Sequence, residues 1–265
     1  MMTKLASTKP ASIRPSSANT LLYGLVGAAV LVGIWQLLSL VVNPAVLASP
    51  GDTVVALWHL AAEGNLWRQG FITLRRLVLG LLMGGVLGLG LGVFAGLRPA
   101  VRSFLEPVRW LSMTVPAVVV AVLAMMWLGI GERQVIFVVA VIVAPVIYVN
   151  TVAGVLAVDE RLLEMGRVYG FSRRQMLLHL YLPGIGSPVF AGLTLAAGIG
   201  VRAAVLGEVL GAFDGIGHSF SRAMSFLKTP EVFAWVIAIL ALMAILEFVV
   251  LNPARKRVMR WKRPT

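Results

Sequence analysis

The feature that most restricts the fold of this chain is a set of apolar runs, each about as long as a bilayer is thick. A bilayer core of about 30 Å requires roughly 20 apolar residues in one helix. Five such runs contain no charged residue, and Glu247 interrupts a sixth near its end. The runs are 21–42, 77–97, 110–131, 134–158, 182–201 and 232–251. We therefore predict an all-α polytopic membrane protein with six transmembrane helices.

The composition excludes most classes of soluble protein. Hydrophobic residues make up 59% of the 265 residues and charged residues 13%, whereas soluble domains average about 25% charged residues. A soluble chain of this length has too little interior for so much apolar side chain. A cytosolic enzyme, a disordered chain and a secreted disulfide scaffold are therefore excluded. A nucleic-acid-binding protein is disfavoured, despite a formal net charge of +12.

Metal and redox sites also lack support in the sequence. The chain contains no cysteine, which removes disulfides and thiolate metal sites. Its three histidines are far apart along the chain and suggest no metal motif: His59, His179 and His218. We expect no metal site and no nucleic-acid partner.

The distribution of positive charge predicts the orientation, because cytoplasmic loops carry an excess of Lys and Arg. If both termini are cytoplasmic, 16 of the 23 Lys and Arg residues lie on inside segments.

We expect a disordered tail at 1–20, one transmembrane domain at 21–252 and a basic tail at 253–265. The basic tail is interpreted as a topology anchor next to membrane lipid. Binding of RNA or acidic lipid is the alternative function for it.

Glycine recurs at every fourth position of the second apolar run, at Gly80, Gly84, Gly88, Gly92 and Gly96. Helix association in lipid depends on close approach of the two backbones, and a stripe of small residues permits that approach. We interpret the stripe as a helix-packing face without substrate contact. Three prolines are expected to kink or start helices: Pro116, Pro145 and Pro188.

Ionisable residues at membrane depth are costly and usually face a cavity, a partner or a pathway. Arg202 and Glu208, near the outer end of the fifth run, are therefore candidates for a substrate path. The alternative for Arg202 is that its long side chain reaches the outer interface. Glu208 is expected to shape the outer end of the bundle more than to bind an anion directly. Glu247 is expected at the inner interface.

Two outer loops carry weaker patterns. The loop 43–76 predicts an amphipathic helix along the membrane interface, with Asp52 or Thr53 as its N-cap. The loop 207–231 contains a glycine-rich turn that is expected to cap the pore on the outside.

The segment 159–183 is the longest internal segment on the predicted cytoplasmic side. Asp159 is expected to cap a short helix that Gly170 ends, because glycine adopts positive φ without steric cost. Ser172 and Gln175 have the spacing of a capping box at the start of a second helix, and Pro183 is expected to begin the next membrane helix. Two structured helices indicate a docking element for a cytosolic partner. A plain connector is the alternative.

This segment resembles the EAA motif of permease subunits in binding-protein-dependent ABC importers. The motif reads Glu-Ala-Ala, three residues, Gly, nine residues, Ile-x-Leu-Pro. Four motif positions are kept in register: Glu164, Gly170, Leu182 and Pro183. The positions that depart from it are Met165, Gly166 and Leu180.

Other segments resemble the nitrate, sulfonate, taurine and bicarbonate branch of that family, so that the resemblance covers residues 20–255. These segments are 44–50, 64–67, 73–76, 127–132, 207–208 and 215–217. The branch often has Trp where Val201 stands and a small residue where Arg202 stands. The resemblance therefore implies an importer of a small solute, usually nitrate or a sulfonate such as taurine, without fixing which one.

The resemblance also implies the type I ABC importer permease fold in a bacterial inner membrane. The permease is expected to work as a homodimer with two cytosolic ATPase subunits and an extracytoplasmic substrate-binding protein. ATP and Mg²⁺ would bind the ATPase, because this chain lacks a phosphate-binding Gly-x-x-x-x-Gly-Lys-Ser/Thr loop. We expect no catalytic activity and no cofactor in the chain itself. By resemblance, the coupling residues are Glu164, Met165, Gly166, Gly170, Leu182 and Pro183.

Two other functions remain as alternatives. A self-sufficient secondary transporter or channel is disfavoured by the small number of intramembrane acids and the lack of a visible internal repeat. A membrane enzyme is disfavoured because we find no paired carboxylates, Ser/His/Asp arrangement or histidine metal motif.

Overall fold

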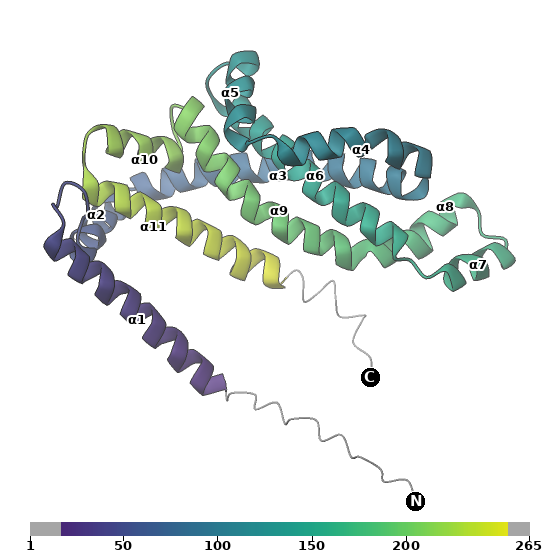
Figure 1. The fold of residues 1–265 in the computed structure, drawn as a ribbon, viewed down its shortest axis with the longest axis horizontal. Helices are drawn as coiled ribbons and strands as arrows, with labels where there is room; N and C mark the ends of the chain where they lie inside the picture. Colours follow the sequence, from purple (N-terminus) through teal and green to yellow (C-terminus); the bar gives the residue numbers. More distant parts are fainter. Residues whose placement is uncertain (1–16, 254–265) are drawn as a thin grey trace, which may run out of the picture.

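The computed structural model describes residues 17–253, and within that range every regular element is a helix. The predicted tails at 1–20 and 253–265 lie outside it, except for residues 17–20, which are helical, and Pro253. The elements in chain order are α1 (Ser17–Val41), α2 (Pro50–Ala62), α3 (Asn65–Leu97), α4 (Pro99–Thr114), α5 (Ala117–Leu128), α6 (Glu132–Leu156), α7 (Glu160–Val168), α8 (Arg173–Met176), η1 (Leu177–Tyr181), α9 (Leu182–Gly211), α10 (Ile216–Ser225), α11 (Thr229–Ile245) and η2 (Leu246–Leu251) (Figure 1).

Five helices in the described range are long and apolar enough to cross a membrane, and a sixth span results if α4 and α5 count as one broken span. The all-α polytopic prediction is confirmed. The single helix expected at 110–131 is wrong, because the chain bends by 99° between α4 and α5. Val115 and Pro116 are extended there. Proline disfavours the helical conformation in the residue before it, so α4 ends at Thr114.

The core of the molecule is a three-helix layer in which α6 lies against both α3 and α9. All five glycines of the stripe on α3 face α6. A Cβ atom on Gly80 would lie 2.5 Å from Val139 Cβ, and one on Gly88 would lie 2.5 Å from the carbonyl oxygen of Ala144. Both distances are too short for real carbon contacts, so the two backbones approach this closely because the positions are glycine.

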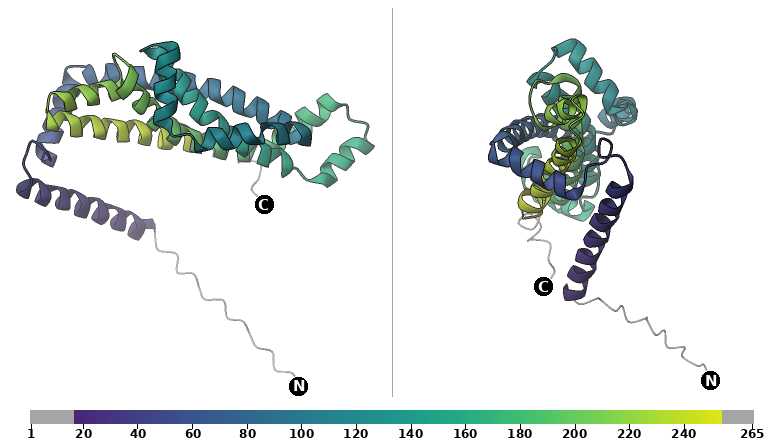
Figure 2. Two further views of the ribbon diagram at one scale, coloured as in Figure 1. Left: turned by 45° about the horizontal axis from the view of Figure 1, so that its top comes forward. Right: turned by 90° about the vertical axis from the view of Figure 1, so that its left-hand side faces the viewer.

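Helix α1 stands apart from this core along most of its length (Figures 1 and 2). None of the residues in its apolar window is buried within the chain. Near its end, Trp35 Nε1 donates a hydrogen bond of 2.9 Å to the carbonyl oxygen of Ala48. The Trp35 ring lies 5.7 Å from that of Phe233 on α11. These contacts attach α1 to the rest of the chain at one end only.

The short helix α2 follows as the sequence predicts, but its cap differs. Its N-cap is Ser49, not Asp52 or Thr53: Ser49 Oγ accepts a hydrogen bond of 3.1 Å from the Asp52 backbone N–H. Pro50 occupies the first turn, where the lack of an N–H does no harm. The helix therefore begins two residues earlier than Asp52.

The helix that leads into α9 is also longer than the sequence predicts. Pro183 does not begin a new helix, because α8, η1 and α9 form one continuous helix from Arg173 to Gly211. The Leu182 N–H bonds to the carbonyl of Leu177, five residues back, which is a π-turn. Such a turn changes the hydrogen-bond register just before Pro183, which has no N–H to donate.

Candidate functional site

The segment with the EAA-like sequence forms a projection at one end of the long molecule (Figure 1). The Asp159 side chain caps α7 by accepting a hydrogen bond of 2.9 Å from the Arg161 N–H. Gly170 has a φ of +70°. The Gly170 N–H bonds to the Arg167 carbonyl and the Phe171 N–H to the Gly166 carbonyl, which together make a Schellman motif. The Asp159 cap and the helix end at Gly170 are thereby confirmed.

The second helix of the projection packs against the first at Gly166. A Cβ atom there would lie 2.6 Å from Met176 Sδ and 2.9 Å from Leu180 Cδ1. Both bonds of the predicted capping box between Ser172 and Gln175 are present. Gly166, a departure from the EAA pattern, therefore lies at the close contact between α7 and the following helix.

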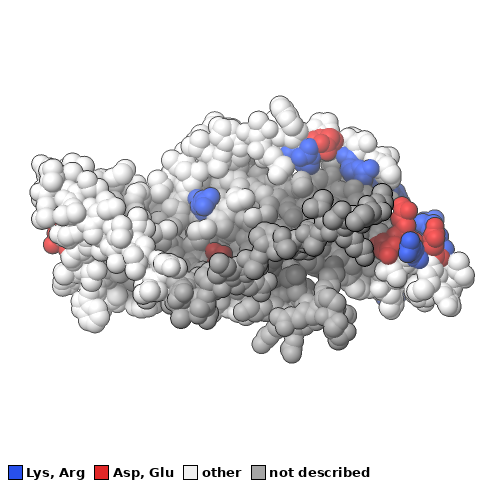
Figure 3. Space-filling view, turned by 60° about the horizontal axis from the view of Figure 1, so that its bottom comes forward, with Lys and Arg blue, Asp and Glu red and all other residues white. Residues whose placement is uncertain are grey.

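Charged side chains gather at this end of the molecule, as Figure 3 shows. Glu164 is exposed, and so are Met165 and Leu182. Basic side chains are exposed beside them at Arg161, Arg167, Arg173 and Arg174. A rigid, capped projection with exposed charged and apolar side chains is suited to docking against another protein.

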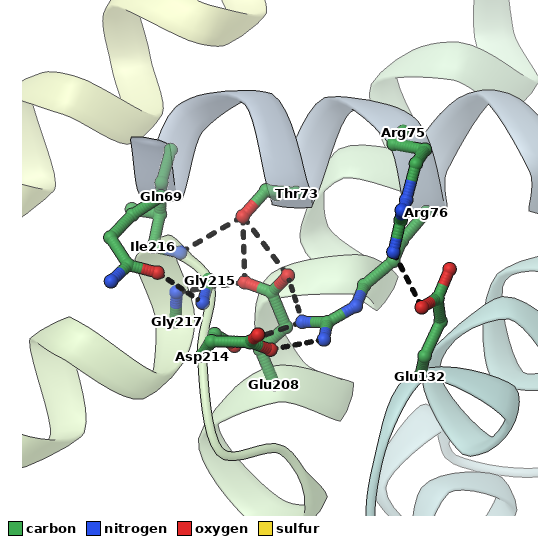
Figure 4. A network of polar contacts seen from close by, with 10 residues as sticks. All are labelled: Gln69, Thr73, Arg75, Arg76, Glu132, Glu208, Asp214, Gly215, Ile216 and Gly217. Carbon is green, nitrogen blue, oxygen red and sulfur yellow. Dashed lines mark hydrogen bonds and ion pairs between the residues drawn. The ribbon is translucent and has the colours of Figure 1, made fainter. Parts of the chain in front are cut away.

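A buried polar cluster lies between α3, α9 and the loop before α10 (Figure 4). Its centre is an ion pair: Arg76 Nη1 lies 2.9 Å from Glu208 Oε1, and the two side chains are 3% and 0% exposed. Arg76 Nη1 also donates to the carbonyl of Asp214 at 2.9 Å, and Nη2 bonds to the Asp214 carboxylate. The Thr73 hydroxyl lies 3.0 and 2.9 Å from the two Glu208 oxygens.

Backbone N–H groups of the glycine-rich turn complete this cluster. The Gly217 N–H donates to Glu208 Oε2 at 2.9 Å, and the Ile216 N–H donates to the Thr73 hydroxyl at 2.9 Å. Gly215 has a φ of +101°, and a Cβ atom there would lie 2.2 Å from Glu208 Oε1. Glycine is required at this position by both its conformation and the space around it.

The cluster gives Glu208 a clear structural place. Its carboxylate is enclosed and accepts hydrogen bonds from Thr73, Arg76 and Gly217. Its bonds join two helices and a loop. Removal of either charge of the ion pair would destabilise this contact, because the other charge would stay buried without a partner. The partners Arg76 and Asp214 were not predicted. Arg76 is 132 residues from Glu208, and its position next to an apolar run is the signal that could have indicated a buried role.

Arg202 lies elsewhere, on an exposed part of α9. It lines a cavity of about 280 Å³ between α9 and the last helix, together with Glu247. The cavity walls are otherwise mostly apolar, from Thr194 to Ile199 on one side and from Met243 to Leu251 on the other. The sequence pattern did not predict that Arg202 and Glu247 share a cavity.

The described residues contain no group of three or more His, Asp or Glu side chains that could hold a metal ion. Outside the buried cluster, Arg75 Nη2 lies 2.5 Å from Glu132 Oε2, and the two side chains are 49% and 38% exposed. Three parts of the described chain remain as candidate functional sites: the projection, the buried cluster and the cavity at Arg202.

Comparison with known proteins identifies the kind of protein. Residues 88–258 match the family of binding-protein-dependent transport system inner membrane components. A Bacillus subtilis protein provisionally named aliphatic sulfonates transport permease protein SsuC is 31% identical over 90% of this chain and 87% of its own length. The Escherichia coli taurine transport system permease protein TauC is 29% identical over 88% of this chain and 87% of its own length.

A solved structure shares the fold. The chain superposes on a chain of the MetNI methionine ABC transporter, in an inward-facing conformation, with a TM-score of 0.63 and 20% identity. The match covers 74% of this chain and 96% of the other. The fold is thus that of an ABC importer permease, and the chain belongs to the family of inner membrane components of binding-protein-dependent transport systems.

Proposed function

We propose that the chain is the permease subunit of an ATP-driven importer that carries small organic sulfonates such as taurine. The observation that carries this proposal is family membership together with two relatives whose names specify aliphatic sulfonates and taurine. Selection of the solute would rest largely on an extracytoplasmic substrate-binding protein. The chain itself would catalyse no reaction, and ATP with Mg²⁺ would bind a separate cytosolic ATPase.

In this proposal two copies of the chain pair around the path, and two ATPase subunits bind on the cytoplasmic side. The projection formed by α7 and α8 is the surface that meets the ATPase. Its rigid caps and exposed charged side chains support that role. The coupling residues of this projection are Glu164, Met165, Gly166, Gly170, Leu182 and Pro183.

In this proposal both termini lie in the cytoplasm. Support comes from the excess of Lys and Arg on the segments that would then be inside, among them the four exposed arginines of the projection. At the opposite end, the cluster around Glu208 closes the outer part of α3 and α9. Of the two residues proposed for the substrate path, Arg202 would meet the solute, and Glu208 would hold the path's outer end in shape.

The test is uptake of radiolabelled taurine by bacterial cells that lack their own sulfonate importers. The chain is expressed together with its ATPase and binding protein, and with an ATPase variant that binds but does not hydrolyse ATP. We expect uptake with the active ATPase and none with the variant. A complex that hydrolyses ATP but takes up neither taurine nor an alkanesulfonate would contradict the proposed cargo.

A further inference from the structure

The cavity that Arg202 and Glu247 share contains opposite charges that are not paired with each other. Neither side chain forms an ion pair within 4.0 Å with another residue between 17 and 253. Both belong to helices long and apolar enough to cross a membrane. Ionisable side chains at such positions are costly unless they face a partner, a pathway or a water-filled cavity.

At two other cavities that contain both a cation and an anion, at least one of the two charges belongs to an ion pair. Lys228 Nζ, in the cavity between α2 and α11, lies 2.8 Å from Glu231 Oε1. Glu132, in the cavity beside α5, is bonded to Arg75. The cavity at Arg202 therefore differs in that a cation and an anion face the same space and both keep their hydrogen-bonding capacity for an occupant.

The geometry of the two helices determines the distance between Arg202 and Glu247. Gly198 and Met243 mark the contact between the helices, since a Cβ atom on Gly198 would lie 3.4 Å from Met243 Cε. Arg202 and Glu247 each lie four residues beyond this contact, and α9 and α11 run in opposite directions (Figure 1). With a rise of 1.5 Å per residue, the two backbone positions are about 12 Å apart along the helices.

We propose that this cavity binds a small zwitterion, with its oxyanion group at Arg202 and its ammonium group at Glu247. A guanidinium group can donate two parallel hydrogen bonds to two oxygens of a sulfonate, and a carboxylate accepts the hydrogen bonds of an ammonium group. The apolar wall between them, at Leu195, Ile199 and Met243, faces the short aliphatic spacer. This inference rests on the proposed function and narrows its cargo to aminoalkanesulfonates, of which taurine is the simplest.

The headgroup of phosphatidylethanolamine has the same chemistry, because it also joins an oxyanion to an ammonium group through two carbons. We assign the cavity to the free solute. A cavity of about 280 Å³ holds a molecule of that size whole, and its two charged residues lie at opposite ends.

The natural absence of cysteine allows a binding test on the chain in its membrane, independent of transport. A single Thr194→Cys substitution places a thiol on the cavity wall, and Ser225→Cys places one at an exposed position of α10 as a control. Labelling by a water-soluble maleimide is followed in phosphatidylglycerol and phosphatidylcholine nanodiscs, with added taurine or ethanesulfonate. We expect taurine to slow labelling at position 194 about tenfold more than ethanesulfonate does, and neither to affect position 225.

Adding Glu247→Gln should remove the preference for taurine, whereas the matched charge removal Glu63→Gln should leave it unchanged. Equal protection by both sulfonates, or none, would overturn the zwitterion site. The measurement is repeated in nanodiscs that also contain phosphatidylethanolamine. If this lipid slows labelling at position 194 and taurine then has no further effect, the assignment to a free solute would be overturned. Protection by taurine without ATP-driven uptake would leave the site in place and contradict the proposed function instead.

Discussion

At the scale of single residues, the most consequential side chains are the buried charges of Arg76 and Glu208. The sequence predicted that Glu208 would shape the outer end of the bundle, and the structure shows its carboxylate buried between α3, α9 and the loop before α10. The sequence could not reveal Arg76 as the partner, because a charged residue next to an apolar run normally marks the end of a membrane-spanning helix. An arginine that is paired and hydrogen-bonded can instead remain inside a long helix, as Arg76 does in α3.

Neighbouring arginines on α3 provide a matched comparison. Arg76→Met should lower the free energy of unfolding by about 3–5 kcal/mol, because it leaves the Glu208 carboxylate buried without its cation. Arg75→Met should cost less than about 1 kcal/mol, because the pair with Glu132 is partly exposed and screened by water. Thermal unfolding of the purified chain in detergent measures both. An equal decrease in the free energy of unfolding in the two variants would show that the buried pair contributes no more to stability than the partly exposed one.

At the scale of elements, apolar runs predicted where helices occur but not where they break. Pro145 and Pro188 lie inside helices that continue past them, whereas Pro116 lies in the sharp bend between α4 and α5. These residues look alike in sequence. Whether a proline ends a helix depends on whether neighbouring helices and local π or 3₁₀ turns can satisfy the backbone carbonyl that the proline leaves without a donor. That depends on packing, which no local sequence pattern contains.

Glycines on α3 allow a test of the packing between α3 and α6. Gly88→Ala should destabilise the chain by about 1–3 kcal/mol, because its Cβ would lie 2.5 Å from the Ala144 carbonyl oxygen. Gly90→Ala is the control, since nothing lies within 4 Å of its Cβ position, and alanine there should be neutral or stabilising by up to about 1 kcal/mol. Denaturation curves that rank the two variants in the opposite order would contradict the observed helix face.

The helix end at Gly170 in the projection can be tested in the same way. Gly170→Pro should leave membrane insertion intact and abolish the coupling of ATP hydrolysis to uptake. Proline cannot adopt the φ of +70° found there, and it removes the N–H that bonds to Arg167. The measurements are the amount of protein in the membrane, the substrate-stimulated ATPase rate and uptake. A variant with normal stimulation and normal uptake would show that the turn at Gly170 is not needed for coupling.

At the scale of the whole molecule, the long body has a charged projection at one end and a buried polar closure toward the other. The sequence predicted the class, the helix-rich architecture and the caps of the projection, because each depends on local pattern. It could not predict which residues far apart in the sequence line the same cavity, such as Arg202 and Glu247. The arrangement suits a subunit that receives a mechanical input at one end and opens or closes a path in the membrane.

The dependence of transport on a separate ATPase is measured in proteoliposomes loaded with ATP and Mg²⁺. One set contains the chain with its ATPase and binding protein, and a second set contains the chain alone, with an imposed proton or sodium gradient. We predict taurine accumulation in the first set, loss of that accumulation when ATP is replaced by a non-hydrolysable analogue, and none in the second set. Gradient-driven accumulation by the chain alone would contradict the importer function and favour a self-sufficient transporter.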